Sequence, residues 1–568
     1  MSISEGLQGK WLPVVTSIIL LLTFWGLVRY ALPKFLLNPP QDCQDNPYKQ
    51  LHLLNSNGIF NIFAMLRRGA VRRSLILTSN HPNKFTNKSQ KKIEAKGMLD
   101  YLSAEQRELK KTRKLYGFFH PYCNAGGGGE KVLWKAVETT LNYDENNLVI
   151  IYTGDNDVDG ETILKNVNKT FDYQLDTGRI VFIFLNYRWL VDDKTWSHFT
   201  LLGQAIGSMI LTAEAVLKCP PDIWCDTMGY PFGYPVVHIL IRIPVLAYTH
   251  YPIISTDMLK KLKSQAPSMK NKIKYYYWKL FMFWYKLVGR YVTISMTNST
   301  WTFNHVNKIW SHFTSPLQSK IVYPPCSSEK LATQEDIPRK NQAVILAQFR
   351  PEKRHKLIIE SYANFLKEKD ETALPPKLIF IGSTRSQLDK DYVATLEKYC
   401  FEDLKIPQSL IEFLTDCPYD EIKKILNEST FGINSMWNEH FGIAVVEYLA
   451  SGLIPLVHAS AGPLLDIVVP WDIVANKQME QGDSTFKTGF FFTDNSDPDY
   501  SPTKKYPTLA ELFNRVCSLT TEEKFAISER GKCCALTKFS DMAFDEAWDG
   551  VLDTLTENTS LDNNKKDR

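Results

Sequence analysis

The chain passes from strand to helix and back to strand within FGINSMWNEHFGIAVVEYLASGLIPLVHASAGP, residues 431–463. Phe431–Asn434 is an apolar run that predicts a buried strand, and Ile454–Val457 predicts a second one. Between them, Phe441 or Gly442 begins a helix. Buried strands separated by a helix are typical of a parallel sheet that is covered on both faces.

Two glutamates frame this helix. Glu439 lies on the loop at the positive end of the helix, and Glu447 lies among apolar neighbours about 12 Å further along it. Carboxylates accept hydrogen bonds from sugar hydroxyls, and a helix N-terminus favours a phosphate group. This element is therefore suited to hold both ends of a nucleotide-sugar. In the alternative interpretation, Glu447 caps a turn or meets an arginine in the core, because a buried carboxylate needs a partner.

Strand-like and helix-like runs alternate along most of the chain, first from Leu115 onward and again from Ala343 onward. The polar stretch Pro324–Gln342 separates the two series. We therefore expect two doubly wound, Rossmann-like α/β domains with a cleft between them, where ligands bind beyond the C-terminal strand ends. The expected divisions are a tail (1–10), a transmembrane anchor (11–30), a basic juxtamembrane region (31–112), an N-terminal domain (113–325), a linker (326–342), a C-terminal domain (343–536), and a C-terminal helix and tail (537–568).

An uncharged apolar segment near the N-terminus predicts a membrane anchor. Residues 11–28 hold no charged side chain, and spanning a bilayer takes roughly 17–25 residues. Arg29 and Lys34 follow where a signal peptide would have a small-residue cleavage site, which favours a retained anchor. The weak excess of positive charge after the segment indicates a cytosolic main body. Lys565 and Lys566 match a dilysine endoplasmic-reticulum retrieval signal, with a frayed charged tail as the alternative.

The composition and two basic or aromatic stretches indicate which partners the chain could bind: nucleic acid, metal or membrane. The formal charge of +4 does not indicate nucleic-acid binding, and the ten cysteines show no disulfide or zinc spacing, which fits a reducing compartment. The basic stretch Lys84–Lys114 is either a surface near anionic lipid headgroups or a solvated linker. The aromatic and lysine-containing stretch Tyr275–Lys286 suits a membrane interface, with a core helix as the alternative.

A run of glycines follows the predicted strand that ends at His120, and it comprises Gly126, Gly127, Gly128 and Gly129. Glycines before a helix let backbone N–H groups approach a ligand closely. The run is neither a Walker A loop nor a GxGxxG loop, which argues against a dinucleotide-dependent oxidoreductase. We interpret it as a ligand-binding loop, with a flexible turn as the alternative.

A cationic cluster opens the second series of strands. Arg350 and Lys353 belong to the run Gln348–Lys356, which follows the predicted strand Ala343–Ala347. Cationic side chains at the C-terminal end of a strand, facing an interdomain cleft, suit a diphosphate. A solvated basic turn is the alternative interpretation.

The chain resembles the retaining glycosyltransferases of family four, which have the GT-B fold. The resemblance begins with the Glu-x7-Glu element, Glu439–Glu447, and with Ala461-Gly462-Pro463 after it. It is closer to the endoplasmic-reticulum α-1,2-mannosyltransferases that extend dolichol-linked oligosaccharides. The further matching motifs are His120–Glu130, Pro221–Ile223, Met228–Tyr230, Thr249–Leu259, Asn298–Thr302, Gln348–Lys353 and Gly462–Val468.

This resemblance implies transfer of mannose from GDP-mannose to Man3GlcNAc2-PP-dolichol and then to Man4GlcNAc2-PP-dolichol, during N-glycan precursor synthesis on the cytosolic face of the endoplasmic reticulum. It implies an N-terminal acceptor domain and a C-terminal donor domain, with other mannosyltransferases of the pathway as candidate partners. By position, Glu447 would bind the ribose, Glu439 would contact the transferred mannose, and Lys353 would contact the donor diphosphate. Phe441 and Gly442 would lie at the donor, where the helix begins.

The resemblance also assigns roles to residues of the first domain, and it leaves the role of Arg350 in the second domain open. His250 would lie near the reacting sugar, and the loop Gly126–Gly129 near the diphosphate and the acceptor. Many family members have Gly-Arg at the start of the second domain, whereas this chain has Ala347-Gln348. Arg350 lies two residues after Gln348, and side chains two positions apart in an extended chain face the same side. Whether Arg350 contacts the phosphate therefore stays open.

Because the donor and the product linkages are both α, the resemblance implies front-face attack, with Lys353 and Arg350 stabilising the leaving diphosphate. We expect no metal or other cofactor. The nearest metal-binding pattern, Asp155-Asn156-Asp157, is better interpreted as a loop turn. The alternatives are another lipid-linked GT-B glycosyltransferase, with a different nucleotide-sugar or a phosphatidylinositol acceptor, and a non-catalytic membrane scaffold.

Overall fold

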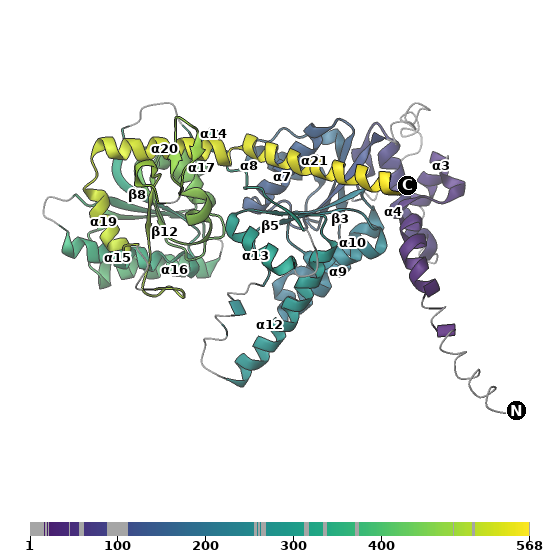
Figure 1. Ribbon diagram of the computed structural model, residues 1–568, viewed down its shortest axis with the longest axis horizontal. Helices are drawn as coiled ribbons and strands as arrows, with labels where there is room; N and C mark the ends of the chain where they lie inside the picture. The colour runs from purple at the N-terminus through teal and green to yellow at the C-terminus, as the bar shows by residue number, and fades with distance from the viewer. Residues whose placement is uncertain are drawn as a thin grey trace. The chain divides into compact units, whose positions relative to one another are not determined.

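The computed structural model contains two units, each built around a mainly parallel sheet (Figure 1). One unit comprises residues 1–296, 306–320 and 551–568, and the other comprises residues 297–305 and 321–550. The residues that the structure describes are 16–17, 20, 22–44, 46–55, 62–87, 112–254, 258–259, 262, 268–311, 317–332, 338–369, 374–384, 386–480, 482–501 and 506–566.

The first unit holds a seven-stranded sheet in the order β3-β2-β1-β4-β5-β6-β7. Its strands are β1 (Lys114–Phe119), β2 (Asn147–Thr153), β3 (Ile180–Phe184), β4 (Ile223–Asp226), β5 (Val245–Thr249), β6 (Ile294–Thr297) and β7 (Gln318–Ile321). The helices between them include α7 (Gly128–Tyr143), α8 (Gly160–Phe171), α9 (Thr200–Lys218), α10 (Tyr234–Leu240) and α12 (Met269–Val288). Helix α13 (Thr300–Trp310) is shared, because its residues up to 305 belong to the second unit. Strands β1 to β5 pair in parallel, so their C-terminal ends share one edge.

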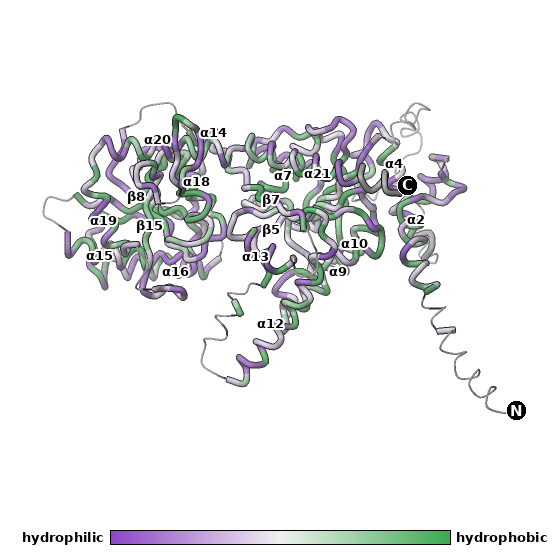
Figure 2. The backbone as a smooth tube through the Cα atoms, viewed as in Figure 1, coloured by the Kyte–Doolittle hydropathy of each residue, from purple (hydrophilic) through white to green (hydrophobic). Residues whose placement is uncertain are grey.

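The second unit holds a six-stranded parallel sheet in the order β10-β9-β8-β11-β12-β15. Its strands are β8 (Lys340–Leu346), β9 (Lys377–Gly382), β10 (Ile411–Thr415), β11 (Ser429–Asn434), β12 (Ile454–His458) and β15 (Phe490–Phe492). The main helices are α15 (His355–Glu368), α16 (Gln387–Lys398), α17 (Tyr419–Glu428), α18 (Ile443–Ala450), α19 (Leu509–Cys517) and α20 (Thr521–Phe539). Helix α21 (Asp541–Lys566) begins in this unit, and its residues from 551 onward belong to the first unit. The prediction of two doubly wound domains is confirmed, and Figure 2 shows their strands as largely apolar.

Each sheet has one point where the strand order reverses. In the first sheet β1 lies between β2 and β4, and in the second sheet β8 lies between β9 and β11. In open parallel sheets a ligand binds beyond the strand ends at such a point, because the connections there diverge to opposite faces. The segments that follow β1, β4, β8 and β11 are therefore the first places to examine for a site.

Residues before β1 form helices that pack into the first unit, where the sequence shows no clear pattern. They are α2 (Leu32–Leu37), α3 (Pro47–Asn55) and α4 (Ile62–Thr78). Val71 and Leu75 of α4 are buried in the core that also contains Trp224 of β4. Arg72 donates a 2.7 Å hydrogen bond to the carbonyl of Lys218, so part of the positive charge of α4 serves packing. The basic stretch 84–114 lies mostly outside the described residues.

Within the described residues, one helix is long and apolar enough to cross a bilayer. This helix is α9, Thr200–Lys218, and half of its apolar window is buried in the first unit, as expected for a core helix. The predicted anchor, residues 11–30, lies largely outside the described part of the chain. Its described end is helical and exposes Phe24 and Trp25, with 66% and 55% of their surfaces accessible.

Candidate functional site

Two of the residues singled out from the sequence meet at the reversal point of the second sheet. Lys353 ends the short turn Pro351–Lys353 after β8, and Glu439 lies on the loop between β11 and α18. The Nζ of Lys353 lies 2.6 Å from Oε2 of Glu439, and both side chains are partly buried. An ion pair at the C-terminal ends of two strands provides one cation that can bind a phosphate group and one carboxylate that can accept hydrogen bonds from ligand hydroxyl groups.

Backbone contacts hold the loop that carries Glu439. The carbonyl of Glu439 accepts a 3.0 Å hydrogen bond from the N–H of Gly462. A Cβ at Gly462 would lie 2.6 Å from the Cα of Phe441, so no larger residue fits there without movement. Gly442, which precedes α18, has φ of 110°, a conformation that favours glycine. These glycines fix where the loop ends and the helix begins.

A buried polar network lies behind the same loop, and sequence reasoning did not find it. The N–H of Asn438 donates to Oγ of Ser460 at 2.9 Å, and that hydroxyl lies 2.9 Å from Nδ1 of His458. The Nε2 of His458 lies 2.8 Å from Asp497, which also pairs with Arg354 at 2.7 Å. Although burial alone raises it, these contacts lower the pKa of Asp497 to about 2. The network ties the residue before Glu439 to two other strand ends.

Glu447 lies on α18 in a half-buried position, between fully buried neighbours such as Val446 and Tyr448. The expectation of a carboxylate deep within an apolar helix is therefore too strong, because this side of α18 is not fully covered. Partial burial, followed by the charge of Glu447, raises the pKa of Tyr419. The hydroxyl of Tyr448 accepts the N–H of Leu346 at 2.7 Å, which ties α18 to the end of β8.

The structure assigns different surroundings to the other residues predicted for this unit. Arg350 is exposed, and within the described chain no acidic side chain pairs with it. Phe441 is 4% exposed and stacks on Tyr323 with ring centres 6.0 Å apart, so its ring belongs to the core. His440, beside Glu439, lies 4.6 Å from the ring of Trp301 and forms an aromatic surface that the sequence did not reveal.

The predicted residues of the first unit also come together at a reversal point. His120, Thr227 and His250 directly follow β1, β4 and β5, which are neighbours in the sheet. Nδ1 of His120 lies 2.8 Å from the hydroxyl of Thr227, and Nε2 of His250 lies 3.0 Å from the Thr227 carbonyl. Thr227 therefore joins the two histidines. A Cβ placed on Gly129 would lie 3.8 Å from Nε2 of His250, so the glycine loop reaches this group.

The glycine loop is shaped by one conformational requirement and one hydrogen bond. Gly126 has φ of 73°, and α7 begins at Gly128. The N–H of Gly127 donates to Oε2 of Glu130 at 2.8 Å. Burial raises the pKa of Glu130, but the contacts from His120 and from backbone N–H groups outweigh it and leave this pKa lowered. Glu130 is therefore a buried, ionised carboxylate at the start of α7.

The protonation state of His250 follows from its contacts. The Thr227 carbonyl only accepts hydrogen bonds, so Nε2 of His250 carries the proton and Nδ1 is an acceptor. Burial lowers the pKa of His250 to about 4. The imidazole is therefore neutral at physiological pH and is unsuited to donate a proton as a general acid.

The pattern considered for metal binding has another structural role. Asp155 pairs with Arg188 and accepts a 3.1 Å hydrogen bond from the N–H of Asn124. These contacts fix the turns after β1 and β2, as expected for a structural loop. In the described part of the chain there is no group of three or more side chains arranged to bind a metal.

The chain is similar to known proteins along nearly its full length. Residues 113–310 match the family described as ALG11 mannosyltransferase N-terminus, and residues 327–497 match glycosyl transferases group 1. The GDP-Man:Man(3)GlcNAc(2)-PP-Dol alpha-1,2-mannosyltransferase of Eremothecium gossypii is 51% identical over 95% of this chain and 94% of its own. The Homo sapiens protein of the same name is 38% identical over 77% of this chain and 86% of its own.

Solved structures support the fold. A sucrose-phosphate synthase from Thermosynechococcus elongatus aligns with a TM-score of 0.53 at 12% identity, covering 78% of this chain and all of that chain. An α,α-trehalose 6-phosphate synthase from Burkholderia multivorans aligns with a TM-score of 0.53 at 12% identity, covering 79% and 99%. At this identity the likeness concerns the GT-B fold alone.

Proposed function

The chain belongs to the family of GDP-Man:Man(3)GlcNAc(2)-PP-Dol alpha-1,2-mannosyltransferases, and we propose that it adds two mannose residues in succession from GDP-mannose. The first acceptor is Man3GlcNAc2-PP-dolichol and the second is the Man4 product of the first transfer. The observation that carries the residue-level proposal is the pair of Lys353 and Glu439 at the reversal point of the second sheet.

In this proposal the donor separates the pair. The diphosphate of GDP-mannose takes Lys353 as its counter-ion, and the N-terminal N–H groups of α18 after Gly442 add a favourable dipole. Once its ion pair with Lys353 is broken, Glu439 accepts hydrogen bonds from hydroxyls of the transferred mannose. Glu447, half-buried further along α18, accepts the ribose hydroxyls. Arg350 is exposed and is available to the outer phosphate oxygens.

The reaction retains configuration, because the α-linked donor gives an α-linked product. The bond between mannose C1 and the diphosphate oxygen breaks, and a bond forms between C1 and the 2-hydroxyl oxygen of the acceptor mannose. The acceptor proton passes to the departing diphosphate oxygen. Lys353 stabilises the charge that develops on that oxygen, which is electrostatic catalysis. The proposal needs no carboxylate nucleophile of the kind that retaining hydrolases use.

The group around His250 is proposed to meet the reacting sugar from the first unit. Its ring is neutral and is held by Nε2 at the Thr227 carbonyl, so it would meet the sugar as an uncharged polar group. The glycine loop beside it, Gly126–Gly129, offers backbone N–H groups to an anionic acceptor. The N–H of Gly127 already donates to Glu130, so in this proposal the other backbone N–H groups of the loop bind the acceptor.

We also propose that the enzyme works at the cytosolic face of the endoplasmic-reticulum membrane, alongside other mannosyltransferases of its pathway. A dolichol-linked acceptor lies in a bilayer, so the catalytic units must reach its surface. Helix α12 supports this, because one side packs through Phe281 and Tyr285 while the other exposes Tyr276, Leu280 and Phe283. Figure 1 shows α12 extending away from the first sheet. Exposed aromatic residues beside lysines are typical of membrane interfaces.

Donor and acceptor profiling tests the proposed function. The purified full chain is offered GDP-mannose, UDP-glucose or UDP-N-acetylglucosamine, each with trimannosyl dolichol-linked acceptor or with phosphatidylinositol. We expect elongation only with GDP-mannose and the dolichol-linked acceptor. Elongation of phosphatidylinositol, or a preference for a UDP-sugar, would instead identify another lipid-linked transferase, and no transfer by a folded protein would favour a scaffold.

A further inference from the structure

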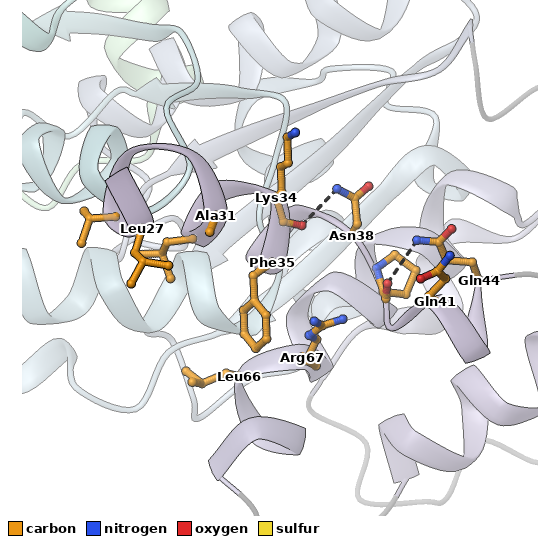
Figure 3. Close-up of a pocket in the computed structure, with 12 residues that line it drawn as sticks. Leu27, Ala31, Lys34, Phe35, Asn38, Gln41, Gln44, Leu66 and Arg67 are labelled. Atoms are coloured by element: carbon orange, nitrogen blue, oxygen red, sulfur yellow. Dashed lines mark hydrogen bonds between the residues drawn. The ribbon is translucent and has the colours of Figure 1, made fainter. Parts of the chain in front are cut away.

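A pocket of about 830 Å³ lies among the N-terminal helices of the first unit, away from the site described above. Figure 3 shows it between the helical segment Leu27–Ala31, helix α2, the short 3-10 turn Gln41–Cys43 and helix α4. All of its lining residues come from positions 27 to 67, and none comes from the strand ends that carry His250 or the glycine loop. The mannosyl transfer therefore does not account for it.

The walls of the pocket change from apolar to polar along its length. Figure 3 shows Leu27 and Ala31 at one end and Gln41 and Gln44 at the other end. Phe35 lies between them with Arg67 beside its ring, and Lys34 is a second cationic residue of the lining. No acidic residue lines it. A cavity of this kind matches a molecule with an apolar chain and an anionic head.

Arg67 is placed to meet an anion. Its guanidinium carbon lies 4.0 Å from the centre of the Phe35 ring, which holds the side chain against the pocket wall. No ion pair joins Arg67 to an acidic side chain anywhere in the described chain, whereas Arg73 on the same helix pairs with Asp222. A guanidinium in a fixed position forms two parallel hydrogen bonds to a phosphate group.

The apolar end of the pocket continues into an exposed apolar helix. Leu20, Leu22, Phe24 and Trp25 precede Leu27 and expose between 55% and 66% of their surfaces. Such a row of large apolar side chains is not stable in water and suits a bilayer. Arg29 lies over the ring of Trp25, a pairing typical of the level where lipid tails meet headgroups. The polar end of the pocket therefore lies at headgroup height.

We propose that this pocket binds an anionic phospholipid of the membrane, with its phosphate on Arg67 and the upper part of one acyl chain along Leu27, Ala31 and Leu66. The proposal rests on the membrane attachment proposed above. Bound lipid would fix the N-terminal helices against the end of the membrane segment and set the height of the first unit over the bilayer.

Native mass spectrometry of the full chain tests the proposal, after equilibration with mixed micelles of phosphatidylcholine and phosphatidylinositol. We expect the wild type to retain phosphatidylinositol and Arg67→Gln to bind it about five-fold more weakly, the effect of one cation at an anionic surface. Arg290→Gln removes an exposed arginine elsewhere in the same unit and should bind as the wild type does. Equal retention by Arg67→Gln and the wild type would overturn the proposal.

A second variant probes the apolar end. Ala31→Trp fills the space between Leu27 and Phe35, so it should expel the lipid while Arg67 stays in place. Unchanged binding by Ala31→Trp would contradict the acyl-chain position. If dolichyl phosphate displaces phosphatidylinositol from the wild type and is held more tightly, the occupant is the isoprenoid and the proposal fails. Mannosyl transfer to a short-chain acceptor, measured on the same samples, separates this outcome from failure of the proposed function.

Discussion

At the scale of single residues, the account depends on Lys353 and Glu439, whose ion pair of 2.6 Å joins two strand ends. We expect Lys353→Ala to lower kcat/KM for GDP-mannose by about 10²–10³-fold, the usual loss when one group that stabilises a developing charge is removed. Lys356→Ala is the matched control, because Lys356 lies in the same basic run but is largely exposed, and its contacts to Glu360 at 3.7 Å and to the Tyr399 ring lie away from Glu439. Equal losses in the two variants would contradict a specific role for Lys353.

A second residue-scale prediction concerns His250 and pH. Its pKa is lowered from 6.5 to about 4 by burial, so the folded protein binds fewer protons than the unfolded chain between these values. Stability should therefore fall as the pH drops from about 6.5 towards 4. In His250→Gln this fall should be smaller, as measured by chemical unfolding at several pH values. An identical pH dependence in both proteins would mean that His250 is not buried as a neutral ring.

The sequence revealed the charged and glycine residues of the site but not the network that supports them. Lys353 and Glu439 were recognisable because each follows a predicted strand, and parallel strands end at a common edge. Asp497 and Arg354 are 143 positions apart and have no local pattern in common. Nothing in the spacing shows that they meet, because that contact depends on the tertiary fold.

At the scale of elements, the position of α18 depends on the contact between Tyr448 and β11. A Cβ at Gly432 would lie 2.3 Å from the Tyr448 ring. Gly432→Ala should therefore cost about 1–3 kcal/mol of stability, because the helix must move away from the strand. Gly26→Ala is the control, since no heavy atom lies within 4 Å of the added methyl group. Urea unfolding measures both, and equal stability would show that α18 is packed loosely.

Elements with a strong local pattern were predicted better than those without one. The strands predicted from the apolar runs Phe431–Asn434 and Ile454–Val457 are present as β11 and β12, with bounds that differ by at most two residues. Helix α4 was missed because arginines interrupt its apolar residues, although its Val71 and Ile76 are fully buried. Two of these arginines, Arg72 and Arg73, bond to the chain around α9 and β4 and therefore belong to the packing.

At the scale of the whole molecule, the proposal assigns the neutralisation of the diphosphate to protein groups. We therefore expect dialysis against EDTA to leave mannosyl transfer unchanged, and added Mg²⁺ or Mn²⁺ to have no effect, because Lys353 and helix N–H groups meet the charge. Product formation per minute, with and without chelator, measures this. A loss that Mn²⁺ restores would show that a metal shares the diphosphate with Lys353.

One measurement tests the central claim most directly, that this chain transfers mannose to the dolichol-linked acceptor and that Glu439 takes part. The full chain and Glu439→Ala are each incubated with GDP-mannose and Man3GlcNAc2-PP-dolichol. The masses of the released glycans are then measured by mass spectrometry before and after α-1,2-mannosidase digestion. We predict that the wild type adds two mannoses, both removed by the mannosidase, and that folded Glu439→Ala adds none. Full activity of Glu439→Ala, or no elongation by the folded wild type, would contradict the account.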